Sequence, residues 1–176
     1  HAVPEGLYRY RLDIAYLGAG FAGWQRQLNA DTVQARVEAA LSELVGESVA
    51  VVGASRTDAG VHARAQVAHI DLSQPFSTKG LVFGSNHHLP SEIRVLSADL
   101  APAGFHARFS AAAKEYSYRI RPGRFVPPDL KPFVLAVPDR LDLERLQAAT
   151  LLLPGRHDFS CFALAGGSHR SPIRTL

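Results

Sequence analysis

The chain has 176 residues, of which 47% are hydrophobic and 20% charged, and its mean hydropathy is near zero. This length allows one sizeable core or two small ones, and the composition is typical of a soluble globular protein. No apolar run is long enough to cross a membrane, and a single cysteine, Cys161, excludes an internal disulfide, so we expect a cytoplasmic protein. The formal charge of +3 comes mostly from arginine, which admits a nucleic-acid partner.

Residues 8–16 alternate in polarity and predict a strand, with Leu12, Ile14 and Tyr16 on one face. The next segment, Gly18-Ala-Gly20-Phe-Ala-Gly23, fits the Gly-x-Gly-x-x-Gly pattern of dinucleotide-binding proteins. In those proteins a helix opens within the glycines, so that its N-terminus meets the pyrophosphate. Here the helix is expected only near Asp31. The glycines therefore predict a tight turn, and we expect no nicotinamide cofactor.

Residues 31–45 predict the clearest helix of the chain. Asp31 can cap its start with Gln34 as the return partner, and Gly46 can end it. One stripe of the helix is apolar, as expected for an element that packs on a core. Its members are Val33, Val37, Ala40, Leu41 and Leu44.

A short loop lies between two extended runs, residues 49–52 and 64–72. It reads Gly53-Ala-Ser-Arg-Thr-Asp-Ala-Gly-Val-His62. Its small residues allow positive φ angles and close backbone approach, so the loop could hold Asp58 at the rim of a sheet. Taken alone, Thr-Asp-Ala-Gly is more often a plain connecting turn.

Residues 77–88 predict a second helix that stops before Pro90, and residues 93–100 predict a further strand. The order up to this point is β-α-β-β-α-β, the split arrangement of ferredoxin-like and RNA-recognition folds. We therefore expect an α+β domain over residues 7–104. Its antiparallel sheet would carry helices on one face and leave the other free for a ligand.

The segment after Pro102 changes character. Phe105-His-Ala-Arg-Phe-Ser-Ala111 is followed by Lys114-Glu-Tyr116-Ser-Tyr118, and residues 116–121 predict a strand. Core packing is the expected role of Tyr118. Arg119, Arg121 and Arg124 form a basic, hairpin-like segment, for which solvated charge and phosphate contact are equally good interpretations.

The remainder predicts half of a second split unit. Residues 127–138 are proline-rich and predict a loop, residues 141–153 predict a helix, and residues 171–176 an extended piece. We therefore expect residues 105–176 to be an incomplete C-terminal domain, and the chain to be a fragment of a longer protein.

Several of these segments together resemble the TruA family of tRNA pseudouridine synthases. The most specific is Arg56-Thr-Asp-Ala-Gly-Val-His-Ala63 with Gln66, Val67 and His69. Others are Tyr16, Gly18, Phe21 and Gly23 with Trp24-Gln-Arg-Gln27, the Phe105 to Ala111 run, Tyr116 and Tyr118, His157-Asp-Phe159 with Phe162, and Ser171-Pro-Ile-Arg-Thr175. The sequence departs from the family at Ser55, where a glycine is usual, and at Leu17, where an aspartate is usual.

The resemblance implies a pseudouridine synthase fold, built from two ferredoxin-like units that share a mixed, largely antiparallel sheet. It implies a catalytic role for Asp58, with Arg56 and Tyr116 beside it in the active site. It also implies RNA contacts from a further group of residues, although core packing is an equally good interpretation of its tryptophan. The group comprises Trp24, Gln25, Arg26, His62, Arg108, Arg121 and Arg124.

The implied reaction converts uridine to pseudouridine in the tRNA anticodon stem-loop, at positions 38 to 40, by a homodimer. One carboxylate suits this chemistry, because it can attack C1′ of the sugar or deprotonate the sugar. The target uridine must leave its stack and needs an aromatic platform, which Tyr116 would supply. Arg56 would pair with Asp58 or hold the flipped-out geometry. No cofactor is consumed.

The alternatives come from other classes. A non-catalytic RNA-binding domain of the same fold is the main one. A metal site is not predicted, because the histidines and Cys161 lack metal-ligand spacing. These histidines are His62, His69, His87, His88, His106, His157 and His169.

Overall fold

The computed structural model describes residues 3–137, 141–162 and 171–176, and divides the chain into two compact units, residues 1–116 and 117–176. In its described part, residues 3–116, the first unit contains four strands, two α-helices and a short 3₁₀ helix, η1 (Gly18–Gly20). In chain order the longer elements are β1 (Tyr8–Tyr16), α1 (Val33–Val45), β2 (Val52–Gly53), β3 (Ala63–Leu72), α2 (Thr78–His88) and β4 (Ile93–Leu100). The chain is therefore of the α+β class.

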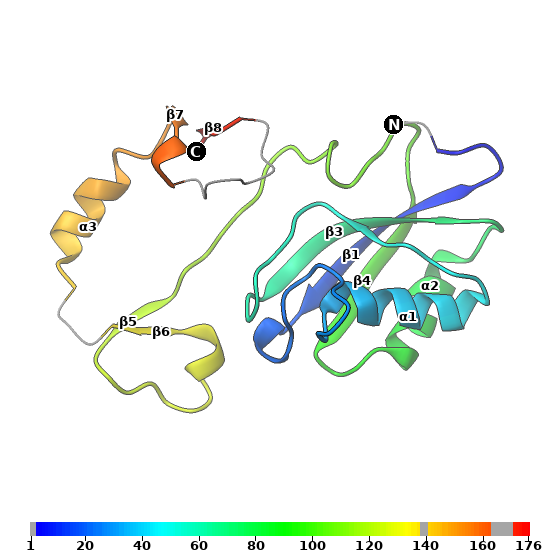
Figure 1. The fold of residues 1–176 in the computed structure, drawn as a ribbon, viewed down its shortest axis with the longest axis horizontal. Coiled ribbons are helices and arrows are strands. Elements are labelled where there is room, and N and C mark those ends of the chain that lie inside the picture. Colours follow the sequence, from blue (N-terminus) through cyan, green and yellow to red (C-terminus); the bar gives the residue numbers. More distant parts are fainter. Residues whose placement is uncertain (1–2, 138–140, 163–170) are drawn as a thin grey trace. The chain divides into compact units, whose positions relative to one another are not determined.

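The four strands of the first unit form one antiparallel sheet in the order β2-β3-β1-β4, as expected for an antiparallel α+β domain. Helices α1 and α2 pack against each other on one face of it (Figure 1). The core lies between the helices and this face, because alternate residues of each strand point toward it. Its fully buried side chains include Leu12, Ile14, Leu41, Ile70 and Leu81.

Helix α1 begins at Val33, two residues later than predicted, and its cap is Thr32 rather than Asp31. The Thr32 hydroxyl accepts the Ala35 N–H, whereas Asp31 forms an ion pair with Arg36 at 2.8 Å. Asp31 is thus engaged by a guanidinium on the first turn, which leaves the hydroxyl next to it as the cap. The predicted end at Gly46 is confirmed, with φ of 75° at that residue.

The strand predicted over residues 49–52 is only partly formed, since β2 comprises Val52 and Gly53 alone. The two preceding valines are buried, but their N–H groups bond to α1 instead of to a strand. Val49 donates to the Ser42 hydroxyl and Val51 to the Glu38 carboxylate. Helix side chains have replaced the sheet ladder here.

The other face of the sheet is half covered, although the sequence predicted it to be free. Arg9 on β1 is buried; it forms a bidentate ion pair with Asp71 on β3, at 2.7 and 2.8 Å, and donates to the Phe105 carbonyl at 2.8 Å. The buried His69 accepts the Ala107 N–H at 3.2 Å. The expected first domain ended at residue 104, but residues 105–107 lie on its sheet.

The second unit contains short elements: β5 (Ile120–Pro122), η2 (Lys131–Phe133), β6 (Leu135–Val137), α3 (Leu143–Thr150), β7 (Arg156–Asp158), η3 (Ser160–Phe162) and β8 (Ile173–Thr175). The predicted strand over 116–121 is reduced to β5. Strand β5 pairs in parallel with β6, so the basic segment is not a hairpin and the predicted loop contains a strand. Helix α3 is shorter than the predicted 141–153, and β7 pairs with β8.

None of the described residues of the second unit is buried. Tyr118, for which the sequence suggested a core position, is 84% exposed. Across the described ranges, no helix combines the length and apolar character needed to traverse a bilayer.

The covered half of the sheet makes stability depend on pH. Burial lowers the pKa of His69 to about 4, with Arg9 and His106 adding to the effect and Asp71 opposing it. Histidine in an unfolded chain has a pKa of about 6.5, so between these values only the unfolded chain binds the proton. The free energy of unfolding should fall by up to about 3 kcal/mol as pH drops through this window. Urea unfolding at pH 7.5, 5.5 and 4.5 measures it.

A His69→Gln variant is the matched control, because it retains an acceptor for the Ala107 N–H but does not titrate. Its unfolding free energy should change less than that of the wild type over the same pH range. Identical slopes for the two proteins would show that His69 is not the group responsible.

Candidate functional site

The motif loop, which we define as residues 54–62, connects β2 to β3 and is held at its start by β3. The Ala54 N–H donates to the Val67 carbonyl at 2.8 Å. The Gln66 side chain donates to the Ser55 carbonyl at 2.7 Å and accepts from the Ser55 hydroxyl at 3.3 Å. Ser55, which stands where the family that the sequence resembles usually has glycine, therefore fits the loop and adds a hydrogen bond to it.

A second loop, residues 17–24, packs on the motif loop along its length. The Trp24 N–H donates to the Thr57 carbonyl at 3.0 Å and the Gly60 N–H to the Phe21 carbonyl at 3.3 Å. The Gly18 N–H donates to Nδ1 of His62 at 3.1 Å. We call residues 17–24 the glycine loop, because its contacts are made by backbone groups and depend on its glycines.

Two glycines of the glycine loop lie where no side chain fits. A Cβ on Gly18 would overlap the Val61 carbonyl, and one on Gly23 would lie 2.6 Å from the Thr57 carbonyl oxygen. Gly23 also has φ of +95°, a region that favours glycine. Gly18 begins the short 3₁₀ helix η1, whereas the α-helix α1 starts only at Val33. These glycines therefore shape a turn against the motif loop, as predicted, and do not open an α-helix.

Asp58 starts a turn within the motif loop. Its carbonyl accepts the Val61 N–H at 3.2 Å, and Gly60 at the third position has φ of +81°, as a type II turn requires. On the preceding residue, the Thr57 hydroxyl shares a hydrogen bond of 2.9 Å with the Tyr16 hydroxyl. Burial raises the pKa of Tyr16, so this anchor stays neutral and bonded at physiological pH.

The side chains of Asp58 and Arg56 contrast with this fixed backbone. Both are exposed, and neither forms a hydrogen bond or ion pair with any other residue that the structure describes. The expected Arg56–Asp58 pair is therefore not formed. A carboxylate on an anchored turn, exposed and unpaired, can meet an incoming ligand without first breaking a bond.

Side chains of helix α1 form hydrogen bonds to the segments that adjoin both loops. The buried Glu38 carboxylate accepts from Gln34 at 2.9 Å, from the Val51 N–H at 3.0 Å and from Arg26 at 3.0 Å. Gln34 also accepts the Arg26 N–H at 3.0 Å and donates to the Val51 carbonyl at 3.0 Å. The Gln34 N–H also donates to the Trp24 carbonyl at 2.9 Å. Gln34 and Glu38 thus hold both the end of the glycine loop and the segment that leads into the motif loop.

The predicted site residues of these loops have different surroundings. Trp24 is buried, with its ring 5.9 Å from that of Tyr16, and a Cβ on Gly53 would lie 2.8 Å from it, so its ring is a core aromatic. Gln25 is exposed, and Arg26 is 68% exposed despite its ion pair with Glu38. His62 is half-buried and holds the glycine loop through Nδ1.

The remaining predicted site residues belong to neither of these two loops. Arg108 is exposed, with its guanidinium 5.8 Å from the Phe109 ring centroid. Tyr116 ends the first unit and is 66% exposed. Arg121 and Arg124 are exposed residues of the second unit.

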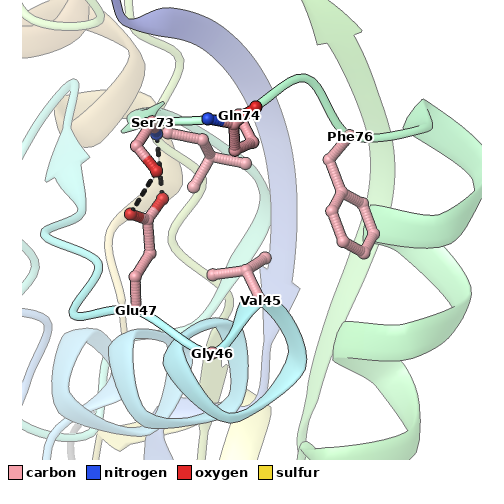
Figure 2. A pocket seen from close by; sticks show the side chains of 7 residues that line it. Val45, Gly46, Glu47, Ser73, Gln74 and Phe76 are labelled. Carbon is pink, nitrogen blue, oxygen red and sulfur yellow. Dashed lines mark hydrogen bonds between the residues drawn. The ribbon is translucent and has the colours of Figure 1, made fainter.

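A pocket lies at the end of β3 opposite the motif loop, and Figure 2 shows side chains that line it. Strand β3 leaves the motif loop at Ala63 and reaches the pocket at Leu72, a span of about 30 Å. The pocket is lined by Val45, Gly46, Glu47, Leu72, Ser73, Gln74 and Phe76. Its one carboxylate, Glu47, accepts two hydrogen bonds from Ser73, which lower the Glu47 pKa. Because this carboxylate is already engaged, we do not take the pocket as a second candidate site.

Metal ligands do not gather in the described parts of the chain, where no group of three His, Cys, Asp or Glu side chains could hold an ion. His169 lies outside the described residues.

Three polar residues hold the site in a way that the sequence did not predict. Glu38 was not singled out at all, whereas Gln66 and Tyr16 were named as motif residues, without an anchoring role. Glu38 is buried among the apolar buried residues of α1, and that mismatch is the signal that could have identified it. Gln66 is buried on β3, where His69 is a second buried polar residue. Tyr16 was assigned to the core face correctly, but its hydroxyl partner is 41 residues away in sequence.

Comparison with known proteins identifies related chains. A family model described as tRNA pseudouridine synthase matches residues 14–110. The chain is also similar to proteins named tRNA pseudouridine synthase A from three bacteria. The protein from Mesorhizobium japonicum is 44% identical over an alignment that covers 96% of this chain and 69% of the relative. The corresponding values are 44%, 96% and 68% for Methylorubrum extorquens, and 46%, 96% and 66% for Nitrobacter winogradskyi. The chain spans about two thirds of the length of these relatives.

The packing of the two loops gives a sharp test with a matched control. Gly23→Ala should destabilise the protein by about 2–4 kcal/mol, because it adds both a strained φ and an overlap with the Thr57 carbonyl. Gly20→Ala in the same loop should change stability little, since no atom lies within 4 Å of its Cβ position. Denaturant unfolding of both variants measures the difference. Equal effects would mean that the close approach at Gly23 is not what holds the loops.

Proposed function

Because the chain belongs to the tRNA pseudouridine synthase family, we propose that it isomerises uridine to pseudouridine in tRNA, with Asp58 as the catalytic carboxylate. The observation that carries the assignment of Asp58 is its position. The residues on both sides of it are anchored by hydrogen bonds to β1, β3 and the glycine loop, while its own side chain is exposed and unpaired among the described residues. A side chain held this way is pre-organised for chemistry on a bound ligand.

The reaction needs little beyond one ionised carboxylate. The bond between C1′ and N1 of uridine breaks, the uracil turns, and a new bond joins C1′ to C5. The C5 hydrogen leaves as a proton and N1 takes one up, so nothing is consumed and no cofactor is required. Asp58 either attacks C1′, as the nucleophile of a retaining glycosidase does, or removes a proton from the sugar.

Arg56 and Tyr116 complete the proposed active site. The target uridine must leave its stack, which costs a few kcal/mol, and the ring of Tyr116 would stack on it. Arg56 lies two residues before Asp58 and has no partner among the described residues. Its guanidinium is thus available to hold the flipped-out RNA strand or to pair with Asp58 once RNA is bound.

The finer features of the proposal follow the family resemblance. They are a ferredoxin-like fold for each unit, the anticodon stem-loop as target at positions 38 to 40, a homodimer and a cytoplasmic location. The strand order β2-β3-β1-β4 supports the fold assignment for the first unit. Contact with RNA is supported by the exposure of the predicted polar residues, which are Gln25, Arg26, Arg108, Arg121 and Arg124. His62 would act indirectly, because it bonds the glycine loop at Gly18. Trp24 would act through packing.

The test is Asp58→Asn in the full-length protein, with Asp99→Asn on β4 as the matched control. As a turn residue alone, Asp58 would tolerate asparagine, which adopts the same turns and hydrogen bonds. As the catalytic carboxylate it would not, and pseudouridine formation should fall by several orders of magnitude. Thermal stability and tRNA affinity should stay near wild type, and Asp99→Asn should retain activity. A folded, tRNA-binding Asp58→Asn protein with substantial turnover would contradict the assignment.

A further inference from the structure

A β-bulge follows the motif loop directly. In the pairing of β1 with β3, Ile14 lies opposite Gln66 and Tyr16 opposite Ala63, so Arg64 and Ala65 share the single partner Ala15. In regular alternation Arg64 would point to the core face with Gln66. The bulge places it with Ala65 on the side of Ala15, the face opposite the helices, and both residues are exposed.

A second arginine lies in the same row of the sheet. Arg94 on β4 is the register partner of Ala15 from the other side, and it is also exposed. Neighbouring strands lie about 4.8 Å apart, so the two arginine backbones flank the small Ala15 at a separation of about 10 Å. Long side chains from both can reach one phosphate or two adjacent ones.

Neither arginine is neutralised by a carboxylate in the described part of the chain. Arg64 forms no hydrogen bond or ion pair there, and Arg94 donates only to the carbonyls of Pro90 and Ile93, both at 2.6 Å. The acidic residue nearest along this face of β1, Asp13, is paired with Arg11 at 3.0 Å and bonded to Ser97 at 3.2 Å. The row around Ala15 is therefore positive.

The two halves of this sheet face differ. At the end far from the motif loop, the face is covered by residues 105–107 on Arg9, His69 and Asp71. At the end that adjoins the motif loop, Arg64 and Arg94 remain exposed. Within the first unit, the uncovered half thus continues from the loop that carries Asp58.

We propose that Arg64 and Arg94 form a phosphate-binding pair that holds the RNA backbone beside Asp58. This inference rests on the proposed function and adds two contact residues to it, neither of which belongs to the motifs that indicated the family. The pair contacts phosphate and not bases, so it contributes affinity and register without sequence preference. The guanidinium forks suit phosphate oxygens, and their free donors are available for them.

The experiment measures binding of an unmodified tRNA transcript to the full-length protein at several salt concentrations. The variants are Arg64→Gln, Arg94→Gln and the double variant. Lys79→Gln on α2, an exposed cation on the helix face of the sheet, is the matched control. Each arginine replacement should lower the slope of log affinity against log salt by about one, and the double variant by about two. Lys79→Gln should leave the slope unchanged, and Arg64→Lys should restore most of it.

The outcomes separate this inference from the function on which it rests. If the wild type forms pseudouridine but both arginine variants bind tRNA with the wild-type slope, the phosphate pair is wrong and the function stands. A wild type that neither binds tRNA nor forms pseudouridine would remove both. Because the exposed Arg64 side chain forms no hydrogen bond or ion pair in the described part of the chain, its variant should fold normally. An equal loss in Lys79→Gln would reduce the effect to general charge and contradict the pair.

Discussion

The close approach of two loops, backbone against backbone, is the constraint on which the candidate site depends. The motif loop and the glycine loop are joined by two backbone hydrogen bonds, from Trp24 to Thr57 and from Gly60 to Phe21. At this separation of the two backbones, a side chain at position 18 or 23 would clash with the motif loop. Glycine at positions 18 and 23 removes the obstruction. The same segment that mimics a dinucleotide-binding pattern is thus used to position a carboxylate.

This arrangement separates what is fixed from what is free. Side chains of the scaffold anchor the motif loop. Tyr16 from β1 bonds the Thr57 hydroxyl, and Gln66 from β3 bonds the Ser55 carbonyl. Glu38 from α1 accepts the N–H of Val51, which precedes the loop. The exposed side chains of Arg56 and Asp58 take no part in that network. If Arg56 and Asp58 act as proposed, the loop backbone need not be ordered when RNA binds, because that cost has been met during folding.

Much of the first unit was predictable from local patterns. The alternation of Tyr8 to Tyr16 gave β1 its bounds, and Ser77 with Pro90 delimited α2, because these signals act within a few residues. The failures involve distant partners. Thr32 caps α1 in place of Asp31, because Asp31 is paired with Arg36. The N–H groups of Val49 and Val51 bond to side chains of α1 and not to a neighbouring strand. Residues 105–107 cover a sheet face formed by residues far earlier in the sequence. The identity of Asp58 came from its motif, whereas its anchoring needed the fold.

The most direct test of the central claim is the reaction itself. Full-length protein is incubated with an unmodified tRNA transcript and no added cofactor, and pseudouridine is mapped along the RNA. The account predicts pseudouridine confined to the anticodon stem-loop. A protein that binds the transcript but leaves every uridine unchanged would contradict it, and the fold would then serve RNA binding without catalysis.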